Sequence, residues 1–97
     1  MRFDVILLPS AEADLDGYTA REQRVILDAL AQFLEVDADI ETKRRKRLRN
    51  NPLAPWALRI GQFRAFYEIG EPGLVRVSAI GHKKHNDLFI RGEKVII

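Results

Sequence analysis

The sequence predicts a small α+β domain, in which an N-terminal strand and two helices accompany a mainly antiparallel four-stranded sheet. The helices are expected on one face of that sheet. Three patterns predict this fold: an apolar segment at the start, apolar residues at helical spacing over residues 20–36, and alternation with a period of two from residue 56 onward. The 97 residues fit one domain, spanning residues 1–97.

The first strand and the first helix are predicted from short local signals. Phe3–Leu8 is apolar enough for a buried strand, and Pro9 stops it. Ser10 is a suitable cap for a short helix over Ala11–Asp16. Gly17 then ends that helix.

The second helix has the clearest signal in the sequence. Thr19 and Glu22 have the spacing of a capping box, which predicts a helix that starts at about residue 20. Apolar residues then recur at helical spacing and form one broad stripe: Val25, Ile26, Ala29, Leu30, Phe33 and Leu34. This stripe must cover an apolar surface, and the remaining strands supply the only candidate.

Three strands are predicted at Trp56–Ile60, Gln62–Ile69 and Leu74–Ile80, joined by tight turns. The apolar face of the middle strand consists of Phe63, Ala65, Tyr67 and Ile69. Its opposite face, which we expect to be open, consists of Arg64, Phe66 and Glu68. In the last strand, the alternation places Val75, Val77 and Ala79 on one face and Arg76, Ser78 and Ile80 on the other.

Charge is divided unevenly along the chain. Residues 1–41 carry ten acids and three arginines, a net charge of −7, whereas residues 42–97 carry thirteen Lys and Arg against four acids, a net charge of +9. A basic half of this size favours a polyanionic partner. The absence of cysteine excludes disulfides, thiolate metal sites and cysteine nucleophiles. The longest aliphatic run, Val5–Leu8, is too short for a membrane span or a secretory signal, so we expect a cytoplasmic protein.

The largest electrostatic feature is the basic run Lys43–Arg49. No acid lies between Thr42 and Tyr67, and Arg59 and Arg64 add further charge from the strands. Such a run is often only a solvated surface segment, but cations without nearby acids repel one another unless an anion binds them. We therefore favour polyanion binding.

Single residues leave more alternatives open. Arg64 is either an exposed strand arginine, paired with Glu68, or a fixed guanidinium that binds phosphate. The two histidines, His82 and His85, make a weak metal pattern and fit surface positions or proton transfer. Trp56 is expected in the core, whereas Phe66 would share the open face with Arg64 and could stack on a base.

The segment Pro55–Ile69, with its pattern W-x-L-R-I-G-x-F-R-x-F-Y at residues 56–67, resembles the signature region of the RelE/ParE superfamily. Ile80–His85, after the final strand, agrees as well. These proteins are the toxins of bacterial type II toxin–antitoxin pairs. The resemblance covers nearly the whole chain and implies a basic active face on the side of the sheet opposite the helices.

RelE-like members cleave messenger RNA, typically on the ribosome, by attack of the RNA's own 2′-OH on the adjacent phosphate. The resemblance therefore implies an mRNA interferase in which Arg64 binds the phosphate, Lys83 helps to stabilise it and His85 is the general acid. The general base stays open between Asp87 and a lysine. Such a reaction needs no metal and no cofactor from the protein.

The same resemblance implies contacts to RNA from the basic run, the strands and the C-terminal segment. The expected RNA-binding residues are Lys43, Arg45, Lys46, Arg47, Arg49, Arg59, Phe66, Lys84 and Phe89. The expected partners are a cognate antitoxin, mRNA and the ribosome, with no membrane.

Two other functions remain open. A ParE-like toxin on the same fold would inhibit DNA gyrase by binding, without a nuclease site, and a plain nucleic-acid-binding module would have no toxic activity. The apolar ending Val95–Ile97 is expected either to add a strand to the sheet or to meet the antitoxin.

Overall fold

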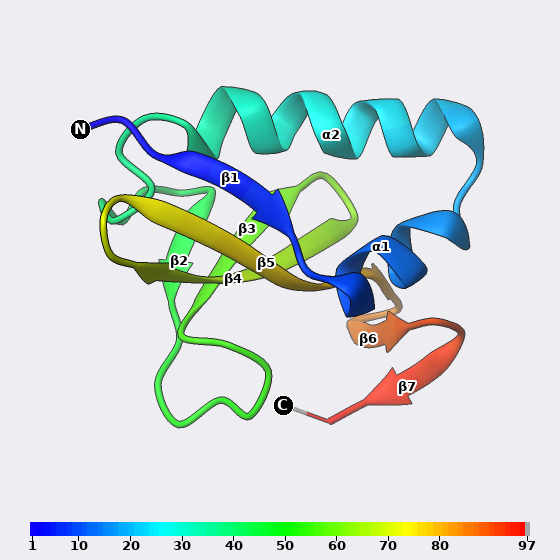
Figure 1. The fold of residues 1–97 in the computed structure, drawn as a ribbon. Coiled ribbons are helices and arrows are strands. Elements are labelled where there is room, and N and C mark those ends of the chain that lie inside the picture. The colour runs from blue at the N-terminus through cyan, green and yellow to red at the C-terminus, as the bar shows by residue number, and fades with distance from the viewer. Residues whose placement is uncertain (97) are drawn as a thin grey trace.

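The computed structural model describes residues 1–96, which fold into two helices on one face of a seven-stranded sheet (Figure 1). The helices are α1 (Pro9–Asp16) and α2 (Ala20–Leu34). The strands are β1 (Asp4–Leu7), β2 (Arg45–Arg47), β3 (Trp56–Ile60), β4 (Phe63–Gly70), β5 (Leu74–Lys84), β6 (Asp87–Ile90) and β7 (Glu93–Val95). The predicted α+β fold is confirmed, but the sheet has seven strands rather than four.

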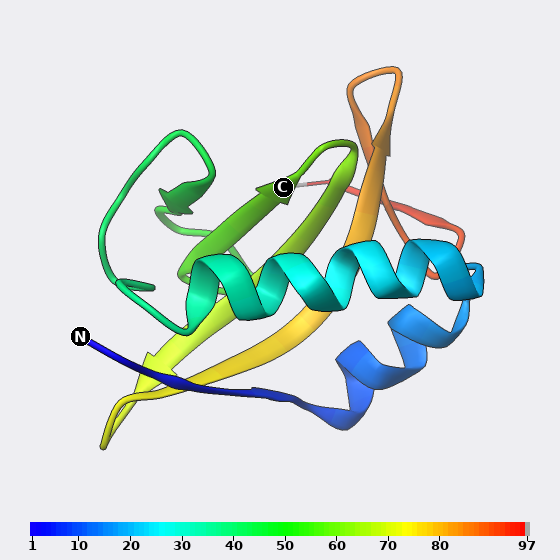
Figure 2. The ribbon, with the colours of Figure 1, turned by 90° about the horizontal axis from the view of Figure 1, so that it is seen from above.

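The sheet is organised around β5. Its strands follow the order β2-β3-β4-β5-β6-β7, and every neighbouring pair in this row is antiparallel. β1 pairs in parallel with the beginning of β5, and β6 pairs with its end. Figure 2 shows the length of β5, from yellow at its start to orange where it reaches β6. The mainly antiparallel topology is therefore as predicted.

Helix α2 begins where the capping box predicts. The Thr19 hydroxyl accepts a hydrogen bond from the Glu22 amide at 3.2 Å, and the Glu22 carboxylate accepts one from the Thr19 amide at 2.9 Å. Ile26, Ala29, Leu30 and Leu34 are buried as expected. Val25 is 47% exposed, because it lies at the flank of the stripe rather than at its centre.

Helix α1 begins two residues earlier than predicted, and Ser10 does not cap it. The cap position is Leu8, and Pro9 takes the first helical position. An amide hydrogen at that position has no partner within the helix, so proline loses no helical hydrogen bond there. The Ser10 hydroxyl instead donates to the carbonyl oxygen of Ser78 at 2.6 Å. Ser10 therefore ties the start of α1 to β5.

A β-bulge in β5 overturns the predicted alternation of that strand. The pairing between β4 and β5 shifts so that Ser78 has no partner on β4. Beyond Ser78, Ala79 lies on the face away from the helices, whereas Ile80 lies in the helix-side core with Val77. One extra residue has thus exchanged the two faces for the rest of the strand.

β5 also runs four residues beyond the predicted end at Ile80. Gly81 allows this extension, because a side chain there would collide with the carbonyl oxygen of Phe89 on β6. β7 ends at Val95, which pairs with Leu88. Val95, the first residue of the apolar ending, therefore adds to the sheet, which is one of the two expected alternatives. Ile97 lies outside the described residues.

Two apolar cores lie on opposite faces of the sheet. The main core joins the helices to the sheet and includes Leu30 of α2 and Tyr67 of β4. The second, smaller core lies on the other face, where Phe66 is covered by Leu53 and by Leu88 of β6. The face expected to be open is consequently covered at one end by residues 48–55 and by the β6–β7 hairpin.

Candidate functional site

A basic groove occupies the uncovered part of the face opposite the helices. It has a volume of about 240 Å³, and its floor is formed by Leu48, Ala57 and Phe66. Six cationic side chains line it: Lys43, Arg44, Lys46, Arg59, Arg64 and Lys83. We call this surface the basic groove.

Strand alternation brings the cations of the basic groove to one face. Arg59 on β3 is the direct cross-strand neighbour of Arg64 on β4. Lys46 on β2 lies opposite Ala57 of β3, and Ala57 belongs to the groove floor. Lys83 reaches the groove from the extended end of β5. The predicted pair Arg64 and Lys83 is therefore brought together, with Lys43, Lys46 and Arg59 beside it.

Arg64 is half-buried and its guanidinium is held by the backbone. Its Nη1 donates to the carbonyl oxygens of Gly61 at 2.7 Å and Phe63 at 2.8 Å. Burial, followed by the nearby charge of Arg59, lowers the pKa of Arg64 from its ordinary value. The alternative pairing of Arg64 with Glu68 is wrong, because Glu68 binds the Arg76 guanidinium at 3.1 Å.

The basic run is divided between the two faces of β2. Arg45 turns toward the helices, where its Nη1 donates to the carbonyl oxygen of Phe33 at 2.9 Å and its Nε to that of Ile40 at 2.8 Å. Its guanidinium thus donates to a carbonyl oxygen in the last turn of α2, which lacks a partner within the helix, and does not line the basic groove. The expected RNA contact of Arg45 is therefore not supported.

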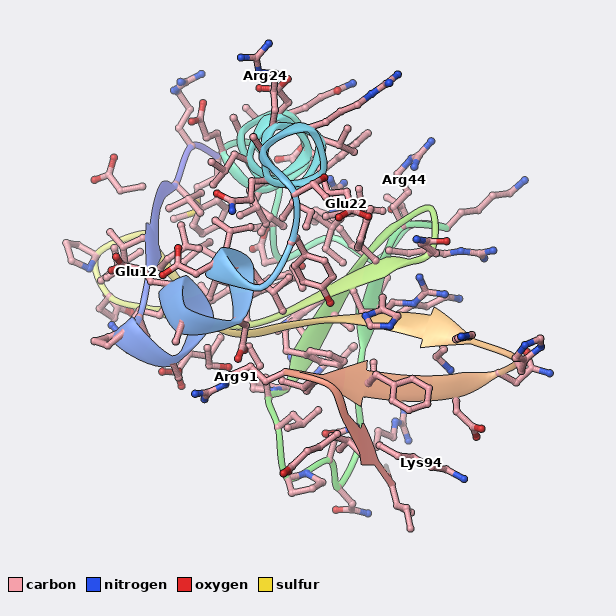
Figure 3. The ribbon with its side chains drawn as sticks, turned by 90° about the vertical axis from the view of Figure 1, so that its right-hand side faces the viewer. Glu12, Glu22, Arg24, Arg44, Arg91 and Lys94 are labelled. Carbon is pink, nitrogen blue, oxygen red and sulfur yellow. The ribbon has the colours of Figure 1, made fainter. Side chains whose placement is uncertain are left out.

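Two further arginines of the run lie over aromatic rings. The guanidinium of Arg47 is 5.7 Å from the ring centre of Trp56, and that of Arg44 is 4.8 Å from the ring centre of Phe33. Figure 3 shows Arg44 projecting into solvent beside the sheet. Trp56 is buried in the core, as predicted. Arg49 is exposed beyond β2 and does not line the groove.

Two aromatic residues expected to stack on bases are not exposed in the groove. Phe66 is only 1% exposed and forms part of the groove floor, so its ring offers no free face. Phe89 lies on the other face of the sheet, stacked on His82 with ring centres 5.6 Å apart. The structure therefore does not support stacking of a base on Phe66 or a contact of Phe89 within the groove.

The histidines lie outside the basic groove. Nδ1 of His82 and the Tyr18 hydroxyl share a hydrogen bond of 2.8 Å on the helix side of the sheet. Lys84, the last residue of β5, is exposed, and so is His85 in the β5–β6 turn, where His85 has a φ of 53° and Asn86 a φ of 70°. In Figure 2 this turn projects beyond the sheet. Of the predicted catalytic residues, Arg64 and Lys83 line the basic groove and His85 does not.

An ion pair between a buried carboxylate and an exposed arginine was missed from the sequence. Asp14 on α1 is only 2% exposed, and its Oδ2 accepts a hydrogen bond from the Ile80 amide at 3.0 Å, next to the bulge. Its Oδ1 lies 2.6 Å from Nε of Arg91, in the β6–β7 turn beside α1 (Figure 3). The sequence offered one signal for this buried carboxylate: Asp14 lies between Ala11 and Leu15, the two apolar positions of α1 that face the core.

Neither a metal site nor a membrane-spanning helix is found among residues 1–96. No group of three or more His, Cys, Asp or Glu side chains is placed to hold a metal ion in this part of the chain. None of the described helices has the length and apolar character needed to cross a membrane.

The fold is that of the RelE/ParE superfamily of toxins. Residues 5–87 match the ParE toxin family of type II toxin–antitoxin systems (parDE), and the chain belongs to this family. The predicted superfamily is thus confirmed, and membership implies a cognate antitoxin.

A solved structure supports the fold independently. The chain is similar to a chain in the toxin–antitoxin complex RelBE2 from Mycobacterium tuberculosis, with a TM-score of 0.70 and 20% sequence identity. The match covers 86% of this chain and 100% of the other. Among curated proteins, none matches the sequence significantly.

Proposed function

We propose that this ParE-family toxin acts by binding its target and that the target is DNA gyrase. Two observations support binding over RNA cleavage: the family to which residues 5–87 belong, and the composition of the basic groove. The proposal replaces the expected mRNA interferase with the alternative that the resemblance left open.

The position of His85 carries this proposal. Cleavage by a 2′-OH requires one group to remove a proton and another to donate one. Among the described residues, those that line the basic groove include no histidine, carboxylate or tyrosine, and His85 lies in the β5–β6 turn outside it. The groove therefore offers fixed positive charge without an evident partner for proton transfer.

RNA cleavage remains the second candidate, because Arg64 and Lys83 do line one groove. A guanidinium and an ammonium at this spacing could stabilise the charge that develops on a phosphate during 2′-OH attack. A groove lysine would then have to act as the general base, and Arg64 or Lys83 as the acid. A ribosome-dependent endonuclease of this kind would need no metal or cofactor.

A paired assay separates the two functions. Purified toxin is added to gyrase with relaxed plasmid and ATP, and separately to translating ribosomes with a defined message. We expect loss of supercoiling at toxin concentrations that leave the message intact. Cleaved message with normal supercoiling would reverse the proposal in favour of the endonuclease. Expression in bacteria without any growth defect would leave only a nucleic-acid-binding module.

A further inference from the structure

Residues 85–96, which include β6 and β7 and which we call the C-terminal hairpin, are joined to the rest of the protein by few backbone contacts. β6 pairs with β5 only at the β5 residues 82–84. β7 pairs with β6 alone. Figure 1 shows the hairpin beneath α1, at the end of the sheet away from β2. One short ladder of backbone hydrogen bonds therefore holds the whole hairpin on the sheet.

One side-chain contact ties the C-terminal hairpin to another element. Among residues 1–96, the ion pair between Arg91 and Asp14 of α1 is the only polar side-chain contact between the hairpin and the rest of the chain, and its Nε–Oδ1 distance is 2.6 Å. The other ion pair of the hairpin, Lys94 with Asp87, lies within it. The Arg91 guanidinium thus reaches past the ladder to the helix layer. We call the Asp14–Arg91 pair the latch.

The carboxylate of the latch depends on Arg91. The Asp14 side chain is 1% exposed, and its Oδ2 accepts the Ile80 amide. Its Oδ1 accepts no hydrogen bond from any other group among the described residues. A buried carboxylate is costly unless an opposite charge compensates it, so Asp14 holds Arg91 more firmly than an exposed acid would. The Arg91 side chain is 57% exposed, so it can separate from Asp14 without crossing the core.

The backbone at Arg91 is unusual for an arginine. Arg91 has a φ of 51° and Gly92 a φ of 78°, as in the two-residue turns that join hairpin strands. Such turns favour Asn, Asp or Gly at the position of Arg91, because a positive φ is costly for other residues. The contact with Asp14 explains why an arginine occupies this position.

The C-terminal hairpin covers an apolar surface. Its residues Leu88, Ile90 and Val95 pack in the second core, which includes Ala57 and Phe66. Ala57 and Phe66 also form part of the floor of the basic groove, and Phe66 is only 1% exposed. If the hairpin moved away from the sheet, the apolar floor of the groove would extend into the space that Leu88 now fills.

We propose that the C-terminal hairpin is a movable cover, that the latch holds it closed, and that its opening extends the apolar floor of the basic groove. The hairpin opens without unfolding of the remaining sheet, because the bond from the Ile80 amide uses the other oxygen of Asp14. This device goes beyond inhibition of gyrase and does not depend on it.

Hydrogen exchange of the full chain, measured by mass spectrometry at increasing urea concentrations, tests whether the hairpin opens separately. Exchange through local opening depends weakly on urea, because little surface becomes exposed, whereas exchange through global unfolding depends on it steeply. We expect weak dependence for residues 85–96 and steep dependence for α2. Equal urea dependence of the two segments would overturn the proposal.

Matched variants test the latch. Arg91→Gln removes its charge and should make opening of the hairpin about tenfold more frequent. In 1 M salt the difference from the wild type should shrink, because screening weakens the ion pair. Lys94→Gln is the control, because it removes a cation of the same hairpin that pairs within it, and it should exchange as the wild type does. Equal exchange of Arg91→Gln and Lys94→Gln would overturn the latch.

A double-mutant cycle tests whether the two charges act together. Asp14→Asn keeps an acceptor for the Ile80 amide, and its combination with Arg91→Gln should raise opening no further than the more damaging single substitution. Multiplied effects of the two substitutions would mean that no ion pair joins them.

The apolar surface beneath the hairpin is tested with the dye bis-ANS. The dye binds exposed apolar surface and should fluoresce more with Arg91→Gln than with Lys94→Gln, because the open form is more populated. Equal fluorescence with the two variants would overturn the claim that the hairpin covers a binding surface.

Discussion

Arg59 and Arg64 are direct cross-strand neighbours on β3 and β4, so two like charges face each other at the centre of the basic groove. Like charges in such a pair destabilise a sheet. Arg64 is further restrained by two carbonyl oxygens, which prevents it from turning away. The pair therefore concentrates positive charge at the expense of the fold's own stability.

Removal of one of these charges should stabilise the protein. Arg59→Gln is expected to raise the free energy of unfolding by about 0.5 kcal/mol at low salt, the scale of one cross-strand pair. In 1 M salt the gain should disappear, because screening weakens the repulsion. Urea unfolding at both salt concentrations measures the effect, with Arg24→Gln as the control. A variant less stable than the wild type at low salt would show that the two charges do not oppose folding.

Two adjacent residues of β2 should have opposite effects, because their side chains lie on opposite faces. Arg45→Met removes the hydrogen bonds to Phe33 and Ile40 and should cost about 1.5–3 kcal/mol of stability, with nucleic-acid binding preserved. Lys46→Met should weaken binding and change stability little. Urea unfolding, and fluorescence anisotropy of a labelled oligonucleotide mixed with the same samples, measure both quantities. Equal effects of the two substitutions would contradict the division of the basic run between the faces.

Asp14 should be required chiefly as an acceptor for the bulged strand. Asp14→Ala leaves the Ile80 amide without its partner and should cost about 1–3 kcal/mol of stability. Asp14→Asn keeps an acceptor oxygen and loses only the charge that faces Arg91, so the loss should be smaller. Thermal unfolding of the two variants gives the comparison. If Asp14→Asn lost as much stability as Asp14→Ala, the ion pair with Arg91 would contribute more to stability than the hydrogen bond to Ile80.

The two tyrosines should make the fold sensitive to alkali. Burial raises the pKa of Tyr18, with smaller contributions from Asp14 and Glu22, and burial also raises the pKa of Tyr67. Above pH 10 the unfolded chain then holds fewer protons than the folded one, so stability falls as pH rises. Tyrosinate absorbance measures this directly: the folded protein should show no full transition at pH 10, whereas the chain in urea should. A normal transition in the folded protein would contradict the burial of both hydroxyls.

Local signals predicted the helices well. The capping box of α2 needs only Thr19 and Glu22, and the apolar stripe repeats within the helix itself. Strands β2 and β6 were missed for the converse reason, and β7 was expected only as one of two alternatives for the apolar ending. They are three or four residues long, and β2 consists only of Arg45, Lys46 and Arg47, so no apolar alternation marks them. Their partners on the sheet determine their structure.

Local signals predicted one part of the candidate site, and contacts between distant segments determine the other part. Alternation placed Arg64 on the face away from the apolar residues of β4, and the structure agrees. The position of His85 depends on how far β5 extends and where it turns, which the packing of β6 on Gly81 controls. Asp14 and Ile80 meet across 66 positions of the chain, and no local pattern could pair them.

His85 gives the most direct test of the central claim that this toxin acts by binding. Wild-type toxin and His85→Ala are compared in the same gyrase supercoiling assay and on the same translating ribosomes. Because His85 lies in the β5–β6 turn outside the basic groove, we predict equal inhibition of supercoiling by both proteins and intact message with either. Cleavage of the message by the wild type, abolished in His85→Ala, would contradict the account and establish the toxin as an endoribonuclease.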